Sequence, residues 1–269
     1  MIATVNRRYG IKLLTFVSEQ FLELLKQNQL DTFDKVWNYQ VNWFEEPNER
    51  RGGWSGVGKV ALINKTSAQV DGTTYAYIKK QQNHGRLTWR NPLNGEPTFK
   101  REFDRLAFLA EHQFAAPKVM FYAESKVDGK QSAVLMTAAL DEYRDLSDLS
   151  LSWWKTASKK QQKNLIKVLA TELRRFHDLG LVHRALYPKH IFVKNVGSSP
   201  EIALIDLEKA RFSWMFWYRA FFDLAALNRH TACCRRTQCL AFFKTYLKQE
   251  KLTYKSKLLA RMIIKRAQR

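Results

Sequence analysis

The sequence predicts an α+β fold, with strands gathered in its N-terminal half and helices in its C-terminal half. Residues 57–64 and 73–80 are rich in Val, Ile, Thr and Tyr, and Asp71-Gly72 supplies a turn between them. Residues 159–179 instead repeat apolar side chains at helical spacing, and Gly180 follows as a C-terminal cap. This order of strands first and helices last predicts two structurally different regions in one chain.

Three segments follow from the patterns. We expect a helical extension over 1–35, because apolar residues recur there at helical spacing: Leu14, Val17, Phe21, Leu24 and Leu25. A sheet-rich region over 36–139 adds a helix at 99–114 and strands at 119–124 and 133–137. A helix-rich region over 140–269 has short strands at 190–193 and 202–205.

Composition limits the classes of function. The 269 residues carry a net charge of +20, which favours contact with polyanions such as nucleotides, phosphorylated sugars or an anionic lipid surface. A solvated basic surface is the simpler alternative. No apolar run reaches the roughly 20 residues that span a bilayer. The three cysteines (Cys233, Cys234 and Cys239) have neither disulfide-framework nor zinc spacing, so we expect reduced thiols in a cytoplasmic protein.

The stretch FHDLGLVHRALYPKHIFV (176–193) carries the strongest functional signal. It resembles the catalytic loop of protein kinases, which reads H-R-D-L, three residues, then Asn. His183 and Arg184 match that pattern. Ala185 stands where the catalytic Asp belongs, and His190 stands where the metal-binding Asn belongs.

A possible phosphate-binding loop precedes it in the sequence. Residues 53–60 read GWSGVGKV, close to the kinase pattern G-x-G-x-x-G-x-V. Small residues there let the backbone approach phosphates, although for this motif alone a glycine-rich hairpin turn is the commoner explanation. The residues concerned are Gly53, Ser55, Gly56 and Gly58.

The next two candidates are a lysine and a glutamate. Lys79, in AYIK, matches the phosphate-contacting lysine of the third kinase strand, and Glu102 on the following helix is its candidate partner. Lys80 competes for the role, but strand alternation places it on the opposite face. Asp206 ends an apolar strand where a kinase has its magnesium-binding aspartate. These elements in order predict a two-lobed, protein-kinase-like fold that uses ATP and Mg²⁺.

The whole pattern resembles the lipopolysaccharide kinase family over roughly residues 40–230. The resemblance rests on these stretches: WFEEPNERRGGWSGV (43–57), YIKKQ (77–81), KREF (100–103), YPKHIFVK (187–194) and IDLEKAR (205–211). It implies a kinase-like fold and transfer of phosphate from ATP to Kdo or heptose sugars of the lipopolysaccharide inner core. Part of the family is associated with acid and weak-acid stress.

The resemblance also assigns roles to single residues. Gly53, Ser55 and Gly56 would line the phosphate loop, and Lys79, paired with Glu102, would hold the phosphates. Asp206 would bind magnesium, with His190 at the second metal-ligand position, although magnesium prefers oxygen ligands. Asp223 resembles the helix aspartate that braces the catalytic loop; a helix N-cap is the alternative.

Ala185 leaves two hypotheses open. An alanine cannot accept the proton of the attacking hydroxyl, and loss of a base costs on the order of 10² to 10⁴ in rate. His190 or His183 could replace it in a slowed or altered sugar kinase. The alternative is a pseudokinase, a nucleotide-binding or scaffolding protein of the acid or envelope stress response.

The last part of the chain suggests where the protein acts. Residues 229–269 contain twelve Lys or Arg and one acid, Glu250, without a recognisable nucleic-acid-binding module. The segment 257–266 alternates cations with apolar residues, which fits either an interfacial helix or a helix packed on the protein. The aromatic run 212–218 fits either a core segment or an acyl-chain contact. We expect lipopolysaccharide core or another anionic glycolipid as partner, with peripheral contact at the inner membrane.

Overall fold

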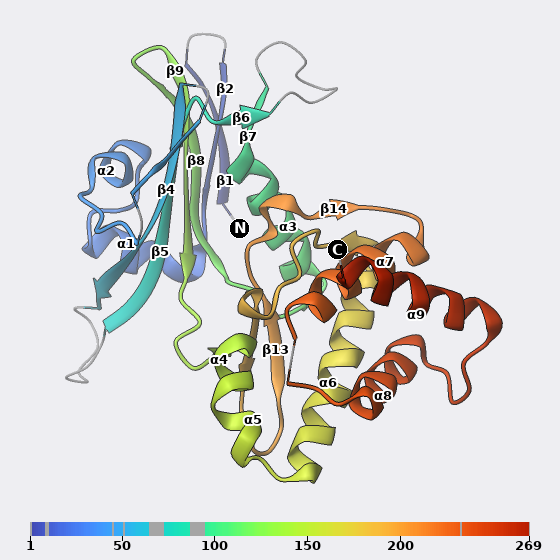
Figure 1. The fold of residues 1–269 in the computed structure, drawn as a ribbon. Helices are drawn as coiled ribbons and strands as arrows, with labels where there is room; N and C mark the ends of the chain where they lie inside the picture. The colour runs from blue at the N-terminus through green and yellow to red at the C-terminus, as the bar shows by residue number, and fades with distance from the viewer. Residues whose placement is uncertain are drawn as a thin grey trace. The chain divides into compact units, whose positions relative to one another are not determined.

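The structure is a computed structural model that describes residues 2–8, 11–44, 46–50, 52–64, 73–86, 95–231 and 233–268. The chain divides into two compact units. Unit 1 consists of Met1–Ala110 and Pro117–Ala139, and unit 2 of Glu111–Ala116 and Leu140–Arg269. Figure 1 shows that strands dominate unit 1 and helices dominate unit 2.

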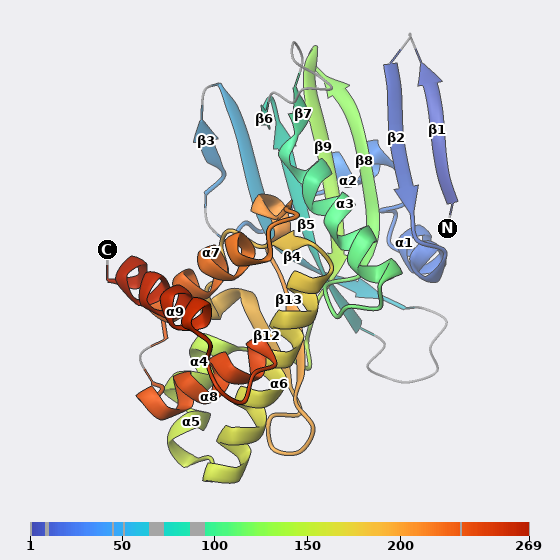
Figure 2. The same cartoon turned by 90° about the vertical axis from the view of Figure 1, so that its right-hand side faces the viewer.

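Unit 1 is built on an antiparallel sheet that has seven strands in the described part of the chain, in the order β1-β2-β8-β9-β5-β4-β3 (Figures 1 and 2). The strands are β1 (Ile2–Arg8), β2 (Ile11–Val17), β3 (Asn48–Arg50), β4 (Gly53–Ile63), β5 (Thr73–Gln82), β8 (Val119–Val127) and β9 (Lys130–Ala138). A small separate pair is formed by β6 (Gly85–Arg86) and β7 (Glu96–Pro97).

Helices cover both faces of this sheet. On one face, Leu25 of α1 (Leu22–Gln27) and Val36 of α2 (Phe33–Asn38) join the buried cluster with strand residues such as Ile78. On the other face lies α3 (Thr98–Glu111), whose Phe103 stacks on Tyr122 with ring centroids 4.5 Å apart. The sheet is therefore buried on both sides, which explains why β8 and β9 read as nearly continuous apolar runs.

The predicted helical extension over 1–35 is wrong for its first half. Residues 2–8 and 11–17 form the paired antiparallel strands β1 and β2, and β2 pairs with β8 through Thr15, Phe16 and Val17. Helical turns begin only at η1 (Glu19–Phe21) and α1. The apolar spacing suited either structure, and pairing with an available sheet edge decided for the strand.

Unit 2 contains the helices α4 (Leu146–Leu151), α5 (Trp153–Thr156), α6 (Lys159–Asp178), α7 (Phe216–Arg229), α8 (Arg236–Leu247) and α9 (Tyr254–Ala267). Its short strands and turns are β10 (Arg144–Asp145), β11 (Leu181–Val182), η2 (Pro188–His190), β12 (Ile191–Lys194), β13 (Glu201–Leu204), η3 (Leu207–Lys209) and β14 (Arg211–Phe212). The long helix α6 begins at a capping box of Ser158 and Gln161, and Gly180 follows it with φ +85°.

The strands β12 and β13 position two of the predicted site residues of unit 2, His190 and Asp206. They pair antiparallel, with Ile191 opposite Leu204, so the residues just before β12 and just after β13 lie at the same end of the pair. His190 precedes β12, and Asp206 follows β13 by two residues. The backbone N–H of Ile205 donates to the carbonyl of His190 at 3.1 Å and holds these two ends together.

Candidate kinase-like site

In unit 1, Lys79 and Glu102 form a direct ion pair. Lys79 Nζ lies 2.7 Å from both carboxylate oxygens of Glu102, which α3 places against β5. The two side chains are 17% and 5% exposed. A cation shared between two oxygens in a poorly solvated place has a fixed position, which is what a phosphate-contacting lysine requires.

Lys80 has a different role from its neighbour. It points to the opposite face of β5, is 3% exposed, and donates to the carbonyls of Trp37 at 2.8 Å and Tyr39 at 2.6 Å. Burial lowers its pKa to about 8. Lys80 therefore fastens the segment after α2 to the sheet, and the contact with nucleotide phosphates stays a prediction for Lys79.

The glycines of β4 have packing reasons of their own. A Cβ on Gly58 would lie 2.2 Å from a methyl of Val41, and one on Gly56 would lie 2.9 Å from the ring of Trp43. A Cβ on Gly53 would meet the carbonyl of Asn83 at 2.2 Å. Residues 41–43 and Pro47 thus lie against β4 where the glycines have no side chains.

The register of β4 divides the predicted phosphate-loop residues between two faces. Val57 pairs with Lys79 and Ser55 with Gln81, so Ser55 shares the face of Lys79. Gly56 pairs with Lys80 and lies on the opposite face, as does Gly58. Phosphate binding by these residues stays a prediction, and Ser55 is the residue best placed beside Lys79.

In unit 2, Asp223 organises the catalytic-like loop. It lies within α7, fully buried, and is not the N-cap of that helix. Its carboxylate accepts from the backbone N–H of His183 at 2.6 Å and of Arg184 at 2.8 Å, and it contacts His177 Nε2 at 2.9 Å. Arg184 has a left-handed backbone with φ 69°, which Asp223 stabilises through this hydrogen bond. The geometry is that of a loop brace.

His183 is a structural residue. Its ring is buried, and Nε2 donates to the carbonyl of Ile205 at 2.9 Å. Its Nδ1 has no hydrogen-bond partner among the described residues. Burial lowers the pKa of His183, so the ring stays neutral more readily than in water. A ring so enclosed cannot reach a substrate hydroxyl.

His190 and Asp206 face one another. His190 Nδ1 donates to the carbonyl of Ala185 at 2.8 Å, which leaves Nε2 pointing toward Asp206 Oδ2 at 3.4 Å. The side chains are 12% and 38% exposed, and Asp206 has a left-handed backbone with φ 58°. A lone pair facing a carboxylate oxygen is suited to sharing a proton or a cation.

The donor set fits a divalent cation only in part. One carboxylate and one imidazole nitrogen are two ligands, and no group of three or more His, Cys, Asp or Glu gathers for a metal in the described ranges. Nucleotide phosphates ordinarily supply the remaining oxygens around such a cation. Asp206 is thus the residue that would hold it, with His190 Nε2 as the second ligand.

The other predicted features lie outside this site. Cys233 and Cys234 have sulfurs 3.9 Å apart, and all three cysteines are free. In α9, Leu259 and Ile263 are buried, whereas Leu258 and Met262 are exposed. The aromatic run is mostly surface: Trp214 is 91% exposed. No helix in the described part of the chain is long and apolar enough to span a membrane.

Comparison with known proteins identifies the fold. A solved structure described as WaaP in complex with acyl carrier protein superimposes with a TM-score of 0.66, covering 94% of this chain and 98% of that one, at 22% identity. The fold is therefore the kinase-like fold of that protein. The Escherichia coli (strain K12) protein InaA is 29% identical over 186 residues, which are 67% of this chain and 79% of that protein.

Residues 34–246 match the lipopolysaccharide kinase (Kdo/WaaP) family, and the chain belongs to that family. The predicted resemblance to the lipopolysaccharide kinase family, and within it to InaA proteins, is thus confirmed. Membership implies use of ATP and a divalent metal in general terms. The Lys79–Glu102 pair and the loop braced by Asp223 are the residues of this chain that fit such use.

Proposed function

We propose that this chain transfers the γ-phosphoryl group of ATP to a sugar hydroxyl of the lipopolysaccharide inner core, of the Kdo or heptose type. The observation that carries the proposal is the closed Lys79–Glu102 ion pair in a member of this family. Phosphoryl transfer has a loose transition state, so positioning and charge stabilisation supply most of the catalysis. A chain that retains these groups can work without the usual aspartate, at a lower rate.

His190 is the residue that we assign as the replacement base. Its Nδ1–H is committed to the Ala185 carbonyl, so Nε2 is the nitrogen left to accept a proton. It would take the hydroxyl proton while the sugar oxygen bonds to the γ-phosphorus and the bond to the β–γ bridging oxygen breaks. A divalent cation beside Asp206 would neutralise phosphate charge. Because one nitrogen cannot bind metal and accept a proton together, the two predicted roles of His190 exclude each other in that step.

Nucleotide binding is the first test. Thermal unfolding is measured with ATP, with and without Mg²⁺, for the natural chain, Lys79→Met and Asp206→Asn. At a hundredfold excess over Kd the folded state gains about 2.7 kcal/mol, so a clear rise in Tm is expected for the natural chain. Lys79→Met should lose the rise, and Asp206→Asn should lose its dependence on Mg²⁺. No rise under any condition would end both the kinase and the nucleotide-binding pseudokinase proposals.

The variant His190→Asn then distinguishes the role of His190 as a base from its role as a metal ligand. An amide oxygen can still bind a cation but cannot act as a base at neutral pH. We expect transfer to purified lipopolysaccharide core to fall by about 10² to 10⁴, with the ATP-dependent Tm rise unchanged. Full activity of His190→Asn would show that another group takes the proton.

The second candidate function is a pseudokinase that binds nucleotide without turnover, in a response to acid or envelope stress. The observation that favours it is Ala185, which offers no proton acceptor and is 1% exposed. Transfer activity that appears only in Ala185→Asp would support this candidate. Transfer by the natural chain that Asp206→Asn abolishes would reject it.

We also propose contact with the cytoplasmic side of the inner membrane, where a glycolipid acceptor would be anchored. Exposed apolar side chains beside cations support it, namely Phe212, Trp214 and Met215 near β14 and Leu258 and Met262 on α9. Sedimentation with anionic vesicles should fall for Leu258→Asp/Met262→Asp, since these residues are not core. Unchanged sedimentation would remove α9 from the proposal.

Because the WaaP structure contains acyl carrier protein, that protein is a second partner to test for this chain.

A further inference from the structure

Two parallel helices of unit 2 enclose a groove away from the residues discussed so far. Gln238 Nε2 of α8 donates to Gln162 Oε1 of α6 at 3.0 Å near the start of both helices. Arg174 Nη1 donates to the carbonyl of Tyr246 at 3.2 Å near their ends. The hollow between them has a volume of about 520 Å³.

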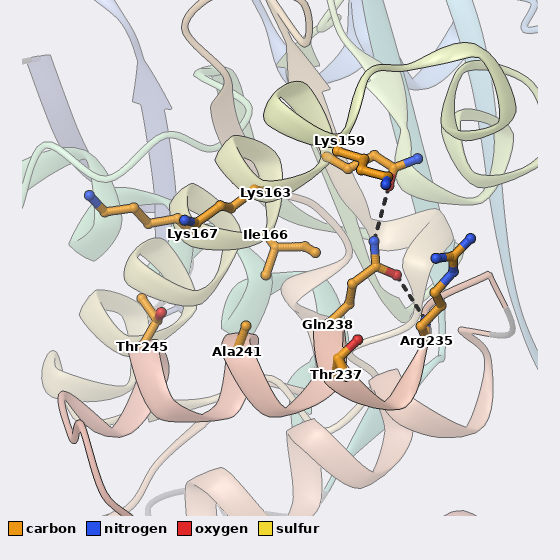
Figure 3. A pocket seen from close by; sticks show the side chains of 10 residues that line it. Lys159, Lys163, Ile166, Lys167, Arg235, Thr237, Gln238, Ala241 and Thr245 are labelled. Carbon is orange, nitrogen blue, oxygen red and sulfur yellow. Dashed lines mark hydrogen bonds between the residues drawn. The ribbon is translucent and has the colours of Figure 1, made fainter.

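The α6 wall of the groove is cationic, and one more cation lies at the start of the α8 wall. Figure 3 shows Lys159, Lys163 and Lys167 along α6, with Arg235 at the start of α8. The three lysines are four residues apart, so successive side chains start about 6 Å from one another along one helix face. All four cations are exposed.

Nothing nearby in the sequence neutralises these cations. Residues 149–171 and 224–249 contain no Asp or Glu. The acids at the far end of α6 have partners of their own: Glu172 pairs with Arg175, and Asp178 pairs with Arg174 and Lys248. Lys159, Lys163 and Lys167 make no ion pair with a described residue. A row of uncompensated cations costs repulsion, which an anionic ligand would relieve.

The floor of the groove is apolar. Ile166 lies between the two helices and faces Ala241 of α8 (Figure 3). The lysine stems add further apolar surface beneath their charged ends. A small anion would leave this floor unused, and a flat bilayer cannot enter a hollow between two helices. A helix that has an apolar stripe with a row of carboxylates along the edge facing α6 matches both the floor and the cationic wall.

We propose that the α6–α8 groove is a docking site for an acidic amphipathic helix of a partner protein. Carboxylates at i and i+4 of such a helix repeat at the same spacing of about 6 Å as the lysines of α6. Its apolar residues would rest on Ile166 and Ala241. The site is independent of the proposed phosphoryl transfer, since it shares no residue with it.

The test uses a fluorescein-labelled synthetic helix with Glu at every fourth position and Leu between them, and fluorescence anisotropy as the readout. A scrambled peptide of the same composition, with its Glu residues spread around the helix, is the matched ligand control. We expect the full chain to bind the patterned peptide about tenfold more tightly than the scrambled one, or about 1.4 kcal/mol. Equal binding of the two would mean attraction to net charge alone and would overturn the proposal.

Variants locate the site. Lys163→Glu/Lys167→Glu should weaken binding by about tenfold, since two ion pairs become repulsive. Lys257→Glu/Lys265→Glu, which makes the same charge change at exposed positions of α9, should leave it within about twofold. Ala241→Gln fills the floor without a charge and should weaken binding too. Equal losses in the groove and α9 variants would overturn the assignment, as would displacement of the peptide by inorganic phosphate at matched ionic strength.

ATP binding distinguishes a failure of the groove proposal from a failure of the phosphoryl-transfer proposal. The ATP-dependent rise in Tm should be the same in the groove variants and the natural chain, which also shows that the variants fold. Loss of the peptide with that rise intact supports the groove. Retention of the peptide by both groove variants rejects it, whatever happens to phosphoryl transfer.

Discussion

The two units retain their predicted site residues to different degrees. In unit 1 the lysine and its glutamate are both present and in direct contact at 2.7 Å. In unit 2 the brace of the loop is present but the proton acceptor is replaced by Ala185. Asp223 contacts the backbone of residues 183 and 184 and makes no bond to the side chain at 185. The conformation of the loop and its chemistry are therefore separable, and one can be lost without the other.

The largest expected effect comes from removing the brace. Asp223→Ala leaves two buried N–H groups and His177 without their acceptor, so we expect the free energy of unfolding to fall by about 3 to 5 kcal/mol. Urea unfolding followed by circular dichroism measures it. Asp178→Ala removes only exposed ion pairs and should cost about 1 kcal/mol or less. Similar costs for the two variants would show that Asp223 does not hold the loop.

Breaking the pair in unit 1 should cost less. Lys79→Met removes the cation beside a carboxylate that is 5% exposed, and we expect a loss of about 2 to 3 kcal/mol. Adding Glu102→Gln removes the buried charge and should restore part of the stability, although ATP binding stays lost. The same urea experiment on the single and double variants tests this. A double variant as weak as the sum of the singles would show that the two side chains are not coupled.

The neighbouring Lys80 makes the free energy of unfolding depend on pH. Its pKa is about 8 in the folded chain and near 10.5 when unfolded, so between these values the unfolded state binds more protons. Stability should therefore rise as pH increases from 8 to 10.5, by up to about 3 kcal/mol. Lys80→Met should lack this rise relative to the natural chain, whereas Lys126→Met, at an exposed position of β8, should keep it. Parallel curves for the natural chain and Lys80→Met would contradict the lowered pKa.

The smallest effect concerns His183. Because its pKa is lowered by burial, the unfolded state takes up a proton first as pH falls below about 6.5. The stability contributed by the neutral ring is thus present above that pH and decreases below it, by at most about 1.4 kcal/mol per pH unit. His183→Gln keeps a donor for the Ile205 carbonyl and should reduce this slope. An unchanged slope would mean that other groups cause the loss of stability in acid.

Much of the fold and of the candidate site could be predicted from the sequence because the signals were local. The Val- and Tyr-rich strands β4 and β5, the capped helix α6 and the spacing of Lys79, Glu102, His183 and Asp206 all follow from short patterns. The strands at 2–8 and 11–17 could not, because the apolar spacing there suits a strand or a helix and pairing with the edge of β8 decided between them. For the glycines of β4 the sequence did not distinguish phosphate binding from a packing role. The residues that crowd them, Val41 and Trp43, come close only when the chain folds.

The sequence by itself determined the fold class, the family and the loss of the acceptor at Ala185, since each is written in residue type and order. The tertiary structure decided which neighbours share a face and which groups meet. It separated Lys79 from Lys80, placed Asp223 within a helix as the brace of the loop, and enclosed His183 while leaving His190 Nε2 toward Asp206. The physical reason is that hydrogen-bond partners and burial depend on contacts between residues far apart in the chain, which no local pattern records.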